Sequence, residues 1–318
     1  MLHDMRTADD NNINEISLNV CANCGKEANI SDMNTCNRCK MVKYCNASCK
    51  KKHRSKHKKK CDRRVAELRD EALFKQPPQQ FEDCPICFIR MPSLSLGRRY
   101  YSCCGKTICN GCVCAPVYDN NGNIVTEKSC PFCRLPAAHS NEEAIKRINR
   151  RVMAGDANAI SNLGFYYANG DLGLPQDWKK ALELWHRAAE LGNAEAYCKI
   201  GYSHEFGEGV EVDKKKAVYY YELAAMGGDV TARYFLGCIE EDAGNMDRSL
   251  KHHMIAVRDG CIDSLDRIKG LYSRRDATKD DYATALNSYQ EYLGETKSKH
   301  RDLAWMATSF IEGLVIRD

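Results

Sequence analysis

Hydrophobic residues recur with a helical period over the second half of the chain. In the segment KKALELWHRAAELG, apolar residues stand three and four positions apart, including Ala181, Leu184, Trp185 and Ala188. This spacing places them on one face of an α-helix. Similar segments follow along the chain and are joined by glycine-containing turns. The pattern therefore predicts a series of paired helices.

The helix pairs form an internal repeat. Gly201 follows Gly164 by 37 positions, and Gly237 follows Gly201 by 36. Trp185 and Tyr221 occupy the same position of successive units, which favours core packing over a ligand groove for their rings. A third unit is about four residues shorter between its helices, and a fourth is degenerate. Stacked units of this kind make an α-solenoid with a concave surface that binds partners.

This array resembles Sel-one-like repeats, which are relatives of tetratricopeptide repeats. The resemblance covers Ala157 to about Leu293. Helices around residues 141–154 and 302–314 are expected to cap its front and back. Gly192 and Gly228 are expected to end helices in the left-handed conformation. The remaining cysteines, Cys198, Cys238 and Cys261, lie in helical patterns and are predicted to be small packing residues.

The N-terminal part of the chain is rich in cysteine. Of the 19 cysteines, 16 lie between Cys21 and Cys133, mostly as C-x2-C pairs. A secreted disulfide scaffold is also cysteine-rich, but the first residues hold no apolar run of the kind that a secretory signal needs. No apolar stretch of about 18 residues exists, so we expect no membrane span. Reduced zinc thiolates in an intracellular compartment, cytoplasmic or nuclear, fit better than disulfides.

Eight candidate ligands stand in four close pairs near the start of the chain. So many soft ligands at this spacing suit two tetrahedral zinc ions. The stretch from Ala47 to Phe74 contains no Gly or Pro and is predicted to be helical, which puts the last two ligands on one helix face. The eight ligands are Cys21, Cys24, Cys36, Cys39, Cys45, Cys49, His57 and Cys61.

This first pattern resembles a MYND-type zinc finger, and the phrase KYCNASC carries much of the resemblance. The resemblance implies crossed ligand sets: Cys21, Cys24, Cys45 and Cys49 for one zinc, and Cys36, Cys39, His57 and Cys61 for the other. MYND modules bind short proline-containing peptides. The family often has an aromatic residue where this chain has Arg54, which puts that specificity in doubt. His53 is expected on the helix surface.

A second cysteine series resembles a RING finger. CPIC opens the series, CGKTICNGC stands in the middle and CPFCR closes it. The resemblance implies a first zinc site made of Cys84, Cys87, Cys109 and Cys112. The second site would take Cys130, Cys133 and two ligands from the middle of the module.

The second site departs from the family. A RING finger usually has a histidine where this chain has Lys106, and a protonated lysine cannot bind zinc. Cys103 and Cys104 are the favoured replacements, while Cys114 and His139 are alternatives. With four ligands in each site, the chain would hold four zinc ions, two in each module.

Three further residues bear on the function that the RING resemblance implies. Ligase-type RING fingers carry an apolar residue, a proline and a basic residue at the places of Ile86, Pro131 and Arg134. In such ligases these residues dock and position the ubiquitin-loaded conjugating enzyme, with no covalent intermediate on the ligase. The chain is therefore a candidate ubiquitin ligase, whose repeats and MYND module would recruit a protein substrate. A non-enzymatic adaptor that only binds proteins or peptides is the alternative.

The charge of the chain is concentrated in one segment. The formal net charge is +4, yet the stretch from Lys40 to Arg64 holds twelve Lys or Arg and one acid. A solvated helix face beside negative zinc thiolates is the simpler interpretation, and a nuclear nucleic-acid partner is the weaker one.

The sequence as a whole predicts a mostly α fold with two small zinc-stabilised modules followed by an α-solenoid. The expected boundaries are 1–17 for a disordered N-terminus, 18–64 for the MYND finger, 65–80 for a linker, 81–138 for the RING-like module and 139–318 for the repeats.

Overall fold

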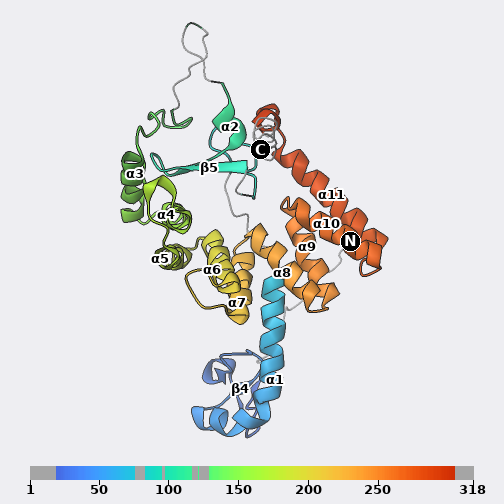
Figure 1. Ribbon diagram of the computed structural model, residues 1–318. Coiled ribbons are helices and arrows are strands. Elements are labelled where there is room, and N and C mark those ends of the chain that lie inside the picture. Colours follow the sequence, from blue (N-terminus) through green and yellow to red (C-terminus); the bar gives the residue numbers. More distant parts are fainter. Residues whose placement is uncertain (1–18, 76–82, 95–96, 117–120, 122–128, 305–318) are drawn as a thin grey trace, which may run out of the picture. The chain divides into compact units, whose positions relative to one another are not determined.

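The computed structural model describes residues 19–75, 83–94, 97–116, 121 and 129–304 (Figure 1). The chain divides between Leu73 and Phe74 into two compact units. The predicted mostly α fold is confirmed, because helices make up most of the described residues and strands are few and short.

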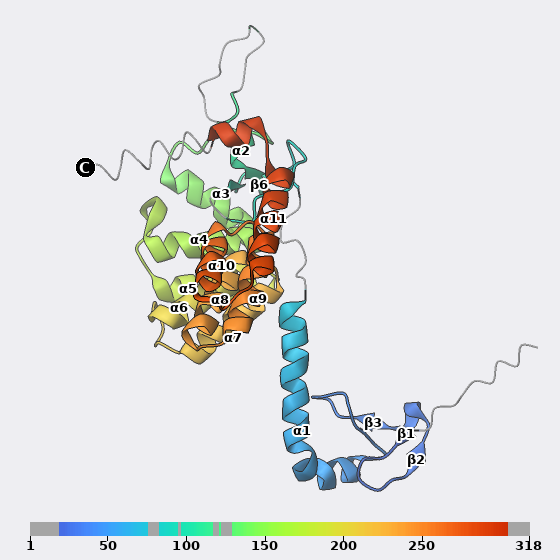
Figure 2. The ribbon, with the colours of Figure 1, turned by 90° about the vertical axis from the view of Figure 1, so that its right-hand side faces the viewer.

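The first unit is built from two small hairpins and nearly all of one long helix (Figure 2). Strand β1 (Asn19–Val20) pairs with β2 (Glu27–Ala28), and β3 (Asn34–Thr35) pairs with β4 (Lys43–Tyr44), both antiparallel. Helix α1 (Ala47–Phe74) follows. Its first turn is capped by Asn46, whose side-chain oxygen accepts a hydrogen bond from the Cys49 N–H at 2.9 Å.

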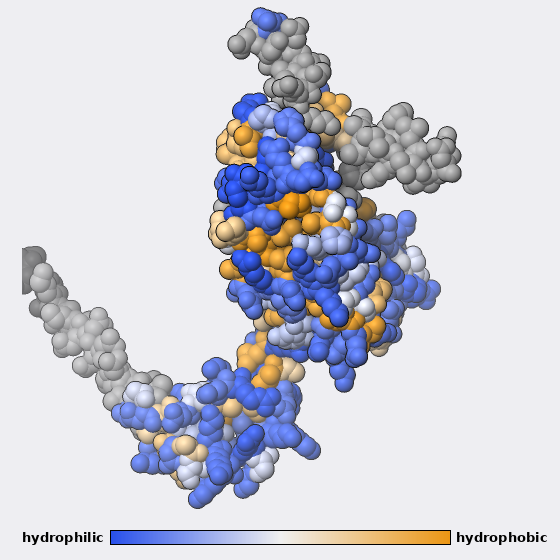
Figure 3. Space-filling view, turned by 60° about the vertical axis from the view of Figure 1, so that its left-hand side comes forward, coloured by the Kyte–Doolittle hydropathy of each residue, from blue (hydrophilic) through white to orange (hydrophobic). Residues whose placement is uncertain are grey.

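Helix α1 has little apolar surface of its own. Its buried residues are Cys49, His57 and Cys61, which recur at helical spacing and face the hairpins, and Leu73 near its end. The core of this unit therefore consists largely of metal-ligand side chains and Tyr44. The rest of its surface is mostly hydrophilic (Figure 3), which agrees with the run of exposed lysines on α1.

The second unit begins with the RING-like module. Strand β5 (Arg98–Tyr101) pairs antiparallel with β6 (Lys106–Cys109), and a short helix, α2 (Asn110–Cys114), follows directly. A single bridge between Ser129 and Pro136 holds the last part of the module. Among the described residues, the buried apolar side chains around the cysteines are Met91 and Ile108. So small a core needs support from elsewhere.

The solenoid occupies the remainder of the second unit (Figure 1). Consecutive helices pack against each other, and their buried faces form several apolar clusters, one within residues 148–200 and others within residues 230–285. The helices are α3 (Asn141–Met153), α4 (Ala157–Asn169), α5 (Trp178–Glu190), α6 (Ala194–Phe206), α7 (Lys214–Met226), α8 (Val230–Asp242), α9 (Met246–Arg258), α10 (Ile262–Arg274) and α11 (Lys279–Thr296).

The predicted caps are found in part. Helix α3 stands at the front of the array, as expected. At the back, residues 299–304 are helical, and the rest of the predicted last helix lies outside the described residues. Gly192 and Gly228 have φ angles of 88° and 93°. Both are thus left-handed two positions after a helix ends, as predicted.

A ring packed over a glycine recurs in the first three repeats. A Cβ atom at Gly164 would lie 2.7 Å from Nε1 of Trp185, and one at Gly201 would lie 2.7 Å from Cδ1 of Tyr221. Both rings are buried, so the prediction of core packing is confirmed. The third repeat uses His253 over Gly237 in the same way. The sequence comparison had not paired His253 with the two aromatic residues, because the shorter turn shifts its position.

Candidate metal centres

The structure brings the candidate ligands together in four clusters. Within each cluster the four donor atoms lie within 4.8 Å of one another. The clusters are Cys21, Cys24, Cys45 and Cys49; Cys36, Cys39, His57 and Cys61; Cys84, Cys87, Cys109 and Cys112; and Cys103, Cys104, Cys130 and Cys133. The first three are the sets that the two family resemblances imply, and the fourth joins Cys130 and Cys133 to the favoured replacements Cys103 and Cys104.

The donor separations fit tetrahedral zinc. A Zn–S bond of about 2.3 Å places the sulfurs of a tetrahedral site roughly 3.8 Å apart. Sγ of Cys36 lies 3.8 Å from that of Cys61, and Sγ of Cys87 lies 3.8 Å from that of Cys109. A disulfide would need about 2.05 Å. Zinc is thus a cofactor of this protein, and the four clusters are its candidate sites.

The C-x2-C pairs share one backbone geometry. In each of four loops, the first cysteine accepts at its carbonyl a hydrogen bond from an N–H four residues on, and its own N–H donates to a later carbonyl. The N–H that donates to this carbonyl belongs to a residue with positive φ. These residues are Gly25 (74°), Lys40 (57°), Phe88 (55°) and Arg134 (64°). Only the first is glycine, so three loops hold a side chain in a conformation that costs energy.

The backbone of these loops also favours thiolates. Hydrogen bonding from the backbone of Cys45 is the main influence that lowers the pKa of Cys21 to about 6. Burial opposes ionisation of Cys84, yet hydrogen bonds from the backbone of Cys109, Cys87 and Ile86 lower its pKa to about 7. The thiolate is the form that binds a metal, and in each of these two sites one ligand is favoured as the thiolate. Other ligands of the same sites have raised pKa values: Cys45, mainly through its hydrogen bond with Cys49, and Cys112, mainly through burial.

The second cluster of the RING-like module uses the cysteine doublet. Sγ of Cys103 lies 3.5 Å from that of Cys133, and Sγ of Cys104 lies 3.8 Å from that of Cys130. The alternatives, Cys114 and His139, are exposed and outside the cluster. Lys106, which replaces the usual histidine, is exposed on β6.

Helices α3 and α4 hold the edge of the RING-like module beside its second cluster. Arg151 of α3 donates hydrogen bonds to the backbone carbonyls of Ser102 (3.2 Å) and Cys103 (3.0 Å). The Tyr100 hydroxyl donates to the carboxylate of Asp156, the N-cap of α4, at 2.7 Å. These contacts join residues about 50 positions apart, and no motif in the sequence predicts them.

The other end of the solenoid holds the module beside its first cluster. The Arg301 guanidinium donates to the carbonyls of Arg90 (2.7 Å) and Ile89 (3.2 Å) and lies 3.7 Å from Sγ of Cys87. Arg90 in turn forms an ion pair with Asp259 at 2.8 Å and another with Glu295. Figure 1 shows β5 and α2 between the α3–α4 end and the α11 end of the array.

The three predicted docking residues lie on the C-x2-C loops of the RING-like module. Arg134 is exposed, and Ile86 and Pro131 are half-buried. Large apolar side chains beside them are exposed too: Phe88 (78%), Phe132 (44%) and Leu135 (43%). The motifs discussed above imply no role for these three residues, and their exposure identifies them. Exposed apolar residues that gather on two loops are typical of a protein-docking surface.

Comparison with known families identifies two of the three kinds of module. Residues 21–61 match the MYND finger family, and residues 157–193 and 194–229 match the Sel1 repeat family. The chain carries a MYND finger and Sel1 repeats. Both are protein-interaction modules, so the chain is a zinc-binding scaffold for protein contacts. Among the described residues, no helix is long and apolar enough to cross a membrane.

Individual relatives match only parts of the chain. Protein sel-1 homolog 2 from Mus musculus is 33% identical over 41% of this chain and 19% of its own length. E3 ubiquitin-protein ligase DA2 from Arabidopsis thaliana is 42% identical over 17% of this chain and 12% of its own length. The chain thus spans about a fifth or less of these relatives. A Sel1 repeat protein from Oxalobacter formigenes is similar in structure, with 29% identity, a TM-score of 0.43, and coverage of 48% of this chain and 63% of that one.

Proposed function

We propose that the RING-like module of residues 81–138 is a ubiquitin ligase module that docks a ubiquitin-loaded conjugating enzyme. The observation that carries the proposal is the surface of its two C-x2-C loops. They expose Phe88, Phe132 and Leu135 beside Ile86 and Pro131, and they present a guanidinium at Arg134. The similarity to part of a plant protein named as a ubiquitin ligase supports the same assignment.

Arg134 is held where a positioning residue is needed. It directly follows the last cysteine of the second cluster, so the metal site fixes its backbone. Its φ of 64° costs about 1–2 kcal/mol relative to glycine. No hydrogen bond or ion pair of its side chain repays this cost among the described residues. The same left-handed geometry recurs at Lys40 and Phe88, so it belongs to the C-x2-C loop, and in this loop it fixes the backbone from which the guanidinium extends.

The proposed chemistry needs orientation and no covalent bond to this chain. The amine of a substrate lysine attacks the thioester carbonyl between the conjugating enzyme and ubiquitin, and the thiolate of that enzyme leaves. The apolar residues around Ile86 and Pro131 would bind the conjugating enzyme, while Arg134 would hold ubiquitin in a reactive pose. Zinc supplies structure here, because it holds the loops that carry these side chains. The Sel1 repeats and the MYND finger would bring the substrate.

The experiment is ubiquitin discharge from a panel of loaded conjugating enzymes, using full-length protein with its zinc content measured. We expect the wild-type protein to accelerate discharge and Ile86→Ala and Arg134→Ala to abolish the effect with zinc content unchanged. Arg134→Gly is the sharper variant, because it relieves the backbone strain while it removes the guanidinium. It should keep or increase stability and still lose activity.

Lys40→Gly is the matched control. Lys40 occupies the same left-handed position of a C-x2-C loop in the MYND finger, with φ 57°. Its replacement should relieve similar strain and leave discharge unchanged. No acceleration with any conjugating enzyme, from protein with all sites filled, would rule out the ligase and leave the scaffold function alone.

A further inference from the structure

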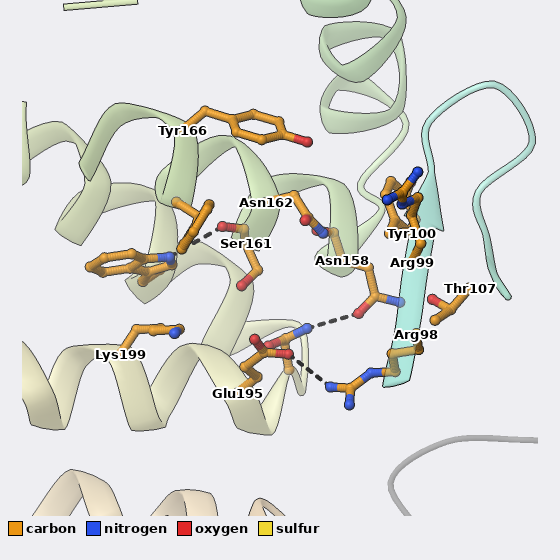
Figure 4. A pocket seen from close by; sticks show the side chains of 13 residues that line it. Arg98, Arg99, Tyr100, Thr107, Asn158, Ser161, Asn162, Tyr166, Glu195 and Lys199 are labelled. Carbon is orange, nitrogen blue, oxygen red and sulfur yellow. Dashed lines mark hydrogen bonds and ion pairs between the residues drawn. The ribbon is translucent and has the colours of Figure 1, made fainter. Parts of the chain in front are cut away.

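A polar cavity lies between the RING-like module and the first repeats. It has a volume of about 280 Å³ and lies between β5 and the helices α4 and α6 (Figure 4). Neither module forms it alone, because one wall belongs to the zinc-binding hairpin and the other to the solenoid. This volume is near the lower end of the range for ligand pockets. It would take a few residues of an extended chain and not a folded domain.

Amide side chains line the solenoid wall of the cavity. Asn158 accepts a hydrogen bond from Nδ2 of Asn193 at 2.9 Å, and Nδ2 of Asn162 donates to the Asn158 carbonyl at 2.7 Å. These bonds fix the orientation of the amides and leave further donors and acceptors in Asn158 and Asn162. An amide that both donates and accepts matches the peptide groups of a bound chain.

Ser161 adds a hydroxyl to the same wall. The residue is only 8% exposed and lines the cavity. Its backbone carbonyl accepts a hydrogen bond from Nε1 of Trp185 at 3.2 Å. Its hydroxyl has no hydrogen bond to any described residue. A hydroxyl can both donate and accept, so this one is available to a polar ligand in the cavity.

The charges of the cavity favour an anionic ligand. Arg98 is paired with Glu195, whose carboxylate lies 3.2 Å away. Arg99 and Lys199 also line the cavity, and neither forms an ion pair with a carboxylate among the described residues. The charged side chains that line the cavity are thus three cations and one carboxylate, with a net charge of two positive units. Arg99 extends from β5, and Lys199 lies across from it on α6 (Figure 4).

We infer that this cavity binds a short acidic peptide segment. The amides of Asn158 and Asn162 would pair with its main chain, and Arg99 and Lys199 would each take a carboxylate. A charge-assisted hydrogen bond contributes about 1.5–3 kcal/mol, so each cation should matter to affinity. This binding does not require ubiquitin transfer, so it stands or fails independently of the ligase proposal.

The test measures peptide binding to the full-length zinc-loaded protein. The probes are fluorescent peptides of about eight residues in an otherwise neutral sequence, bearing two Asp or Glu, two Asn or Gln, or two phosphoserines. Each is made with a free and with an amidated C-terminus, which separates side-chain carboxylates from a terminal one. We expect acidic peptides to bind and their amide counterparts to bind at least tenfold more weakly. A preference for phosphoserine, or none for acidic residues, would overturn the inference.

Variants locate the binding in the cavity. Arg99→Ala and Lys199→Ala should each weaken the acidic peptide about tenfold or more, with zinc content and helix content unchanged. Lys106→Ala is the matched control, since Lys106 is an exposed cation of the neighbouring strand β6 that does not line the cavity. Equal weakening by Lys106→Ala, or no effect of the two cavity variants, would show nonspecific attraction and contradict the inference.

Discussion

The MYND finger and the RING-like module each hold two metal-ligand clusters, but different parts of the chain stabilise them. Each has two clusters of four donors and C-x2-C loops with a left-handed residue. The MYND finger draws three of its ligands from α1, so a helix of its own frames both clusters. The RING-like module has only a short hairpin and a five-residue helix. Its frame comes from the solenoid, through Arg151 at one end and Arg301 at the other.

This difference changes what each module can transmit. A zinc finger that is supported by its own helix folds when it binds zinc and unfolds when it loses zinc. A module fixed at both ends of a solenoid shares its stability with every repeat between them, because repeats couple mainly to their neighbours. A ligand in the cavity between β5 and α4 would therefore act on the RING-like module directly. Four measurements test whether the two modules differ in this way.

Zinc removal should have the largest effect. A structural zinc contributes on the order of 10–16 kcal/mol of folding free energy, so a strong chelator should unfold both modules. The solenoid has an apolar core of its own around Trp185 and Ile160 and should keep its helices. Hydrogen exchange with mass spectrometry would measure this, with protection lost in residues 19–75 and 83–116 and retained in α4–α7. Loss of protection throughout the solenoid would show that the zinc sites stabilise the repeats, which is the opposite of the expected dependence.

Lowering the pH should destabilise the solenoid through two buried histidines, which lie outside both zinc modules. His252 and His253 are fully buried, and burial is the main cause that lowers their pKa values to about 3 and 4. Between these values and about 6.5 the unfolded chain binds protons that the folded chain does not, so stability falls as the pH falls. From pH 7 to pH 5 the two histidines should cost about 4 kcal/mol together.

Denaturant unfolding followed by tryptophan fluorescence would measure this effect, because Trp178 and Trp185 belong to the solenoid. Replacing both histidines by glutamine should flatten the dependence on pH. An unchanged slope in that variant would assign the acid sensitivity to the zinc ligands, which also take up protons.

Arg301→Ala should weaken only one of the zinc modules. The substitution leaves the carbonyls of Ile89 and Arg90 without their donor and removes a positive charge beside Cys87. A loss of about 2 kcal/mol is expected for such hydrogen bonds to a charged group. Competition with a colorimetric chelator should then show two of the zinc ions leaving about tenfold faster or more and the other two unchanged. Arg150→Ala, an exposed arginine on α3, is the control, and equal acceleration of all zinc ions would contradict the distinction.

Sequence reasoning reached the parts of this molecule that depend on local spacing. The intervals between Cys21 and Cys133 suffice to propose zinc-binding modules, while the crossed ligand sets came from the resemblance to two families. The interval between Gly164 and Gly201 suffices to propose the repeat. Contacts between distant segments were missed. Arg301 and Arg151 act on backbone carbonyls, which every residue has, so no partner in the sequence marks them. The cavity beside Arg99 was missed for the same reason, since it exists only once β5 lies against α4 and α6.

Adding one methyl group to the solenoid should have the smallest effect on stability of the four changes. It still tests whether the repeats stabilise the RING-like module. A Cβ at Gly201 would lie 2.7 Å from Cδ1 of Tyr221, which is fully buried and cannot move aside. Gly201→Ala should therefore lower the free energy of unfolding by about 1–3 kcal/mol.

Gly270→Ala is the control, because a Cβ atom at Gly270 would meet only Arg274, at 3.7 Å. The substitution also removes a glycine from a helix, which should stabilise α10 by about 0.5–1 kcal/mol. If the repeats support the RING-like module, Gly201→Ala should also speed the release of its two zinc ions and leave those of the MYND finger unchanged. Opposite shifts of the unfolding midpoint in the two variants, with unchanged release from both modules, would mean that the solenoid and the RING-like module touch without sharing stability.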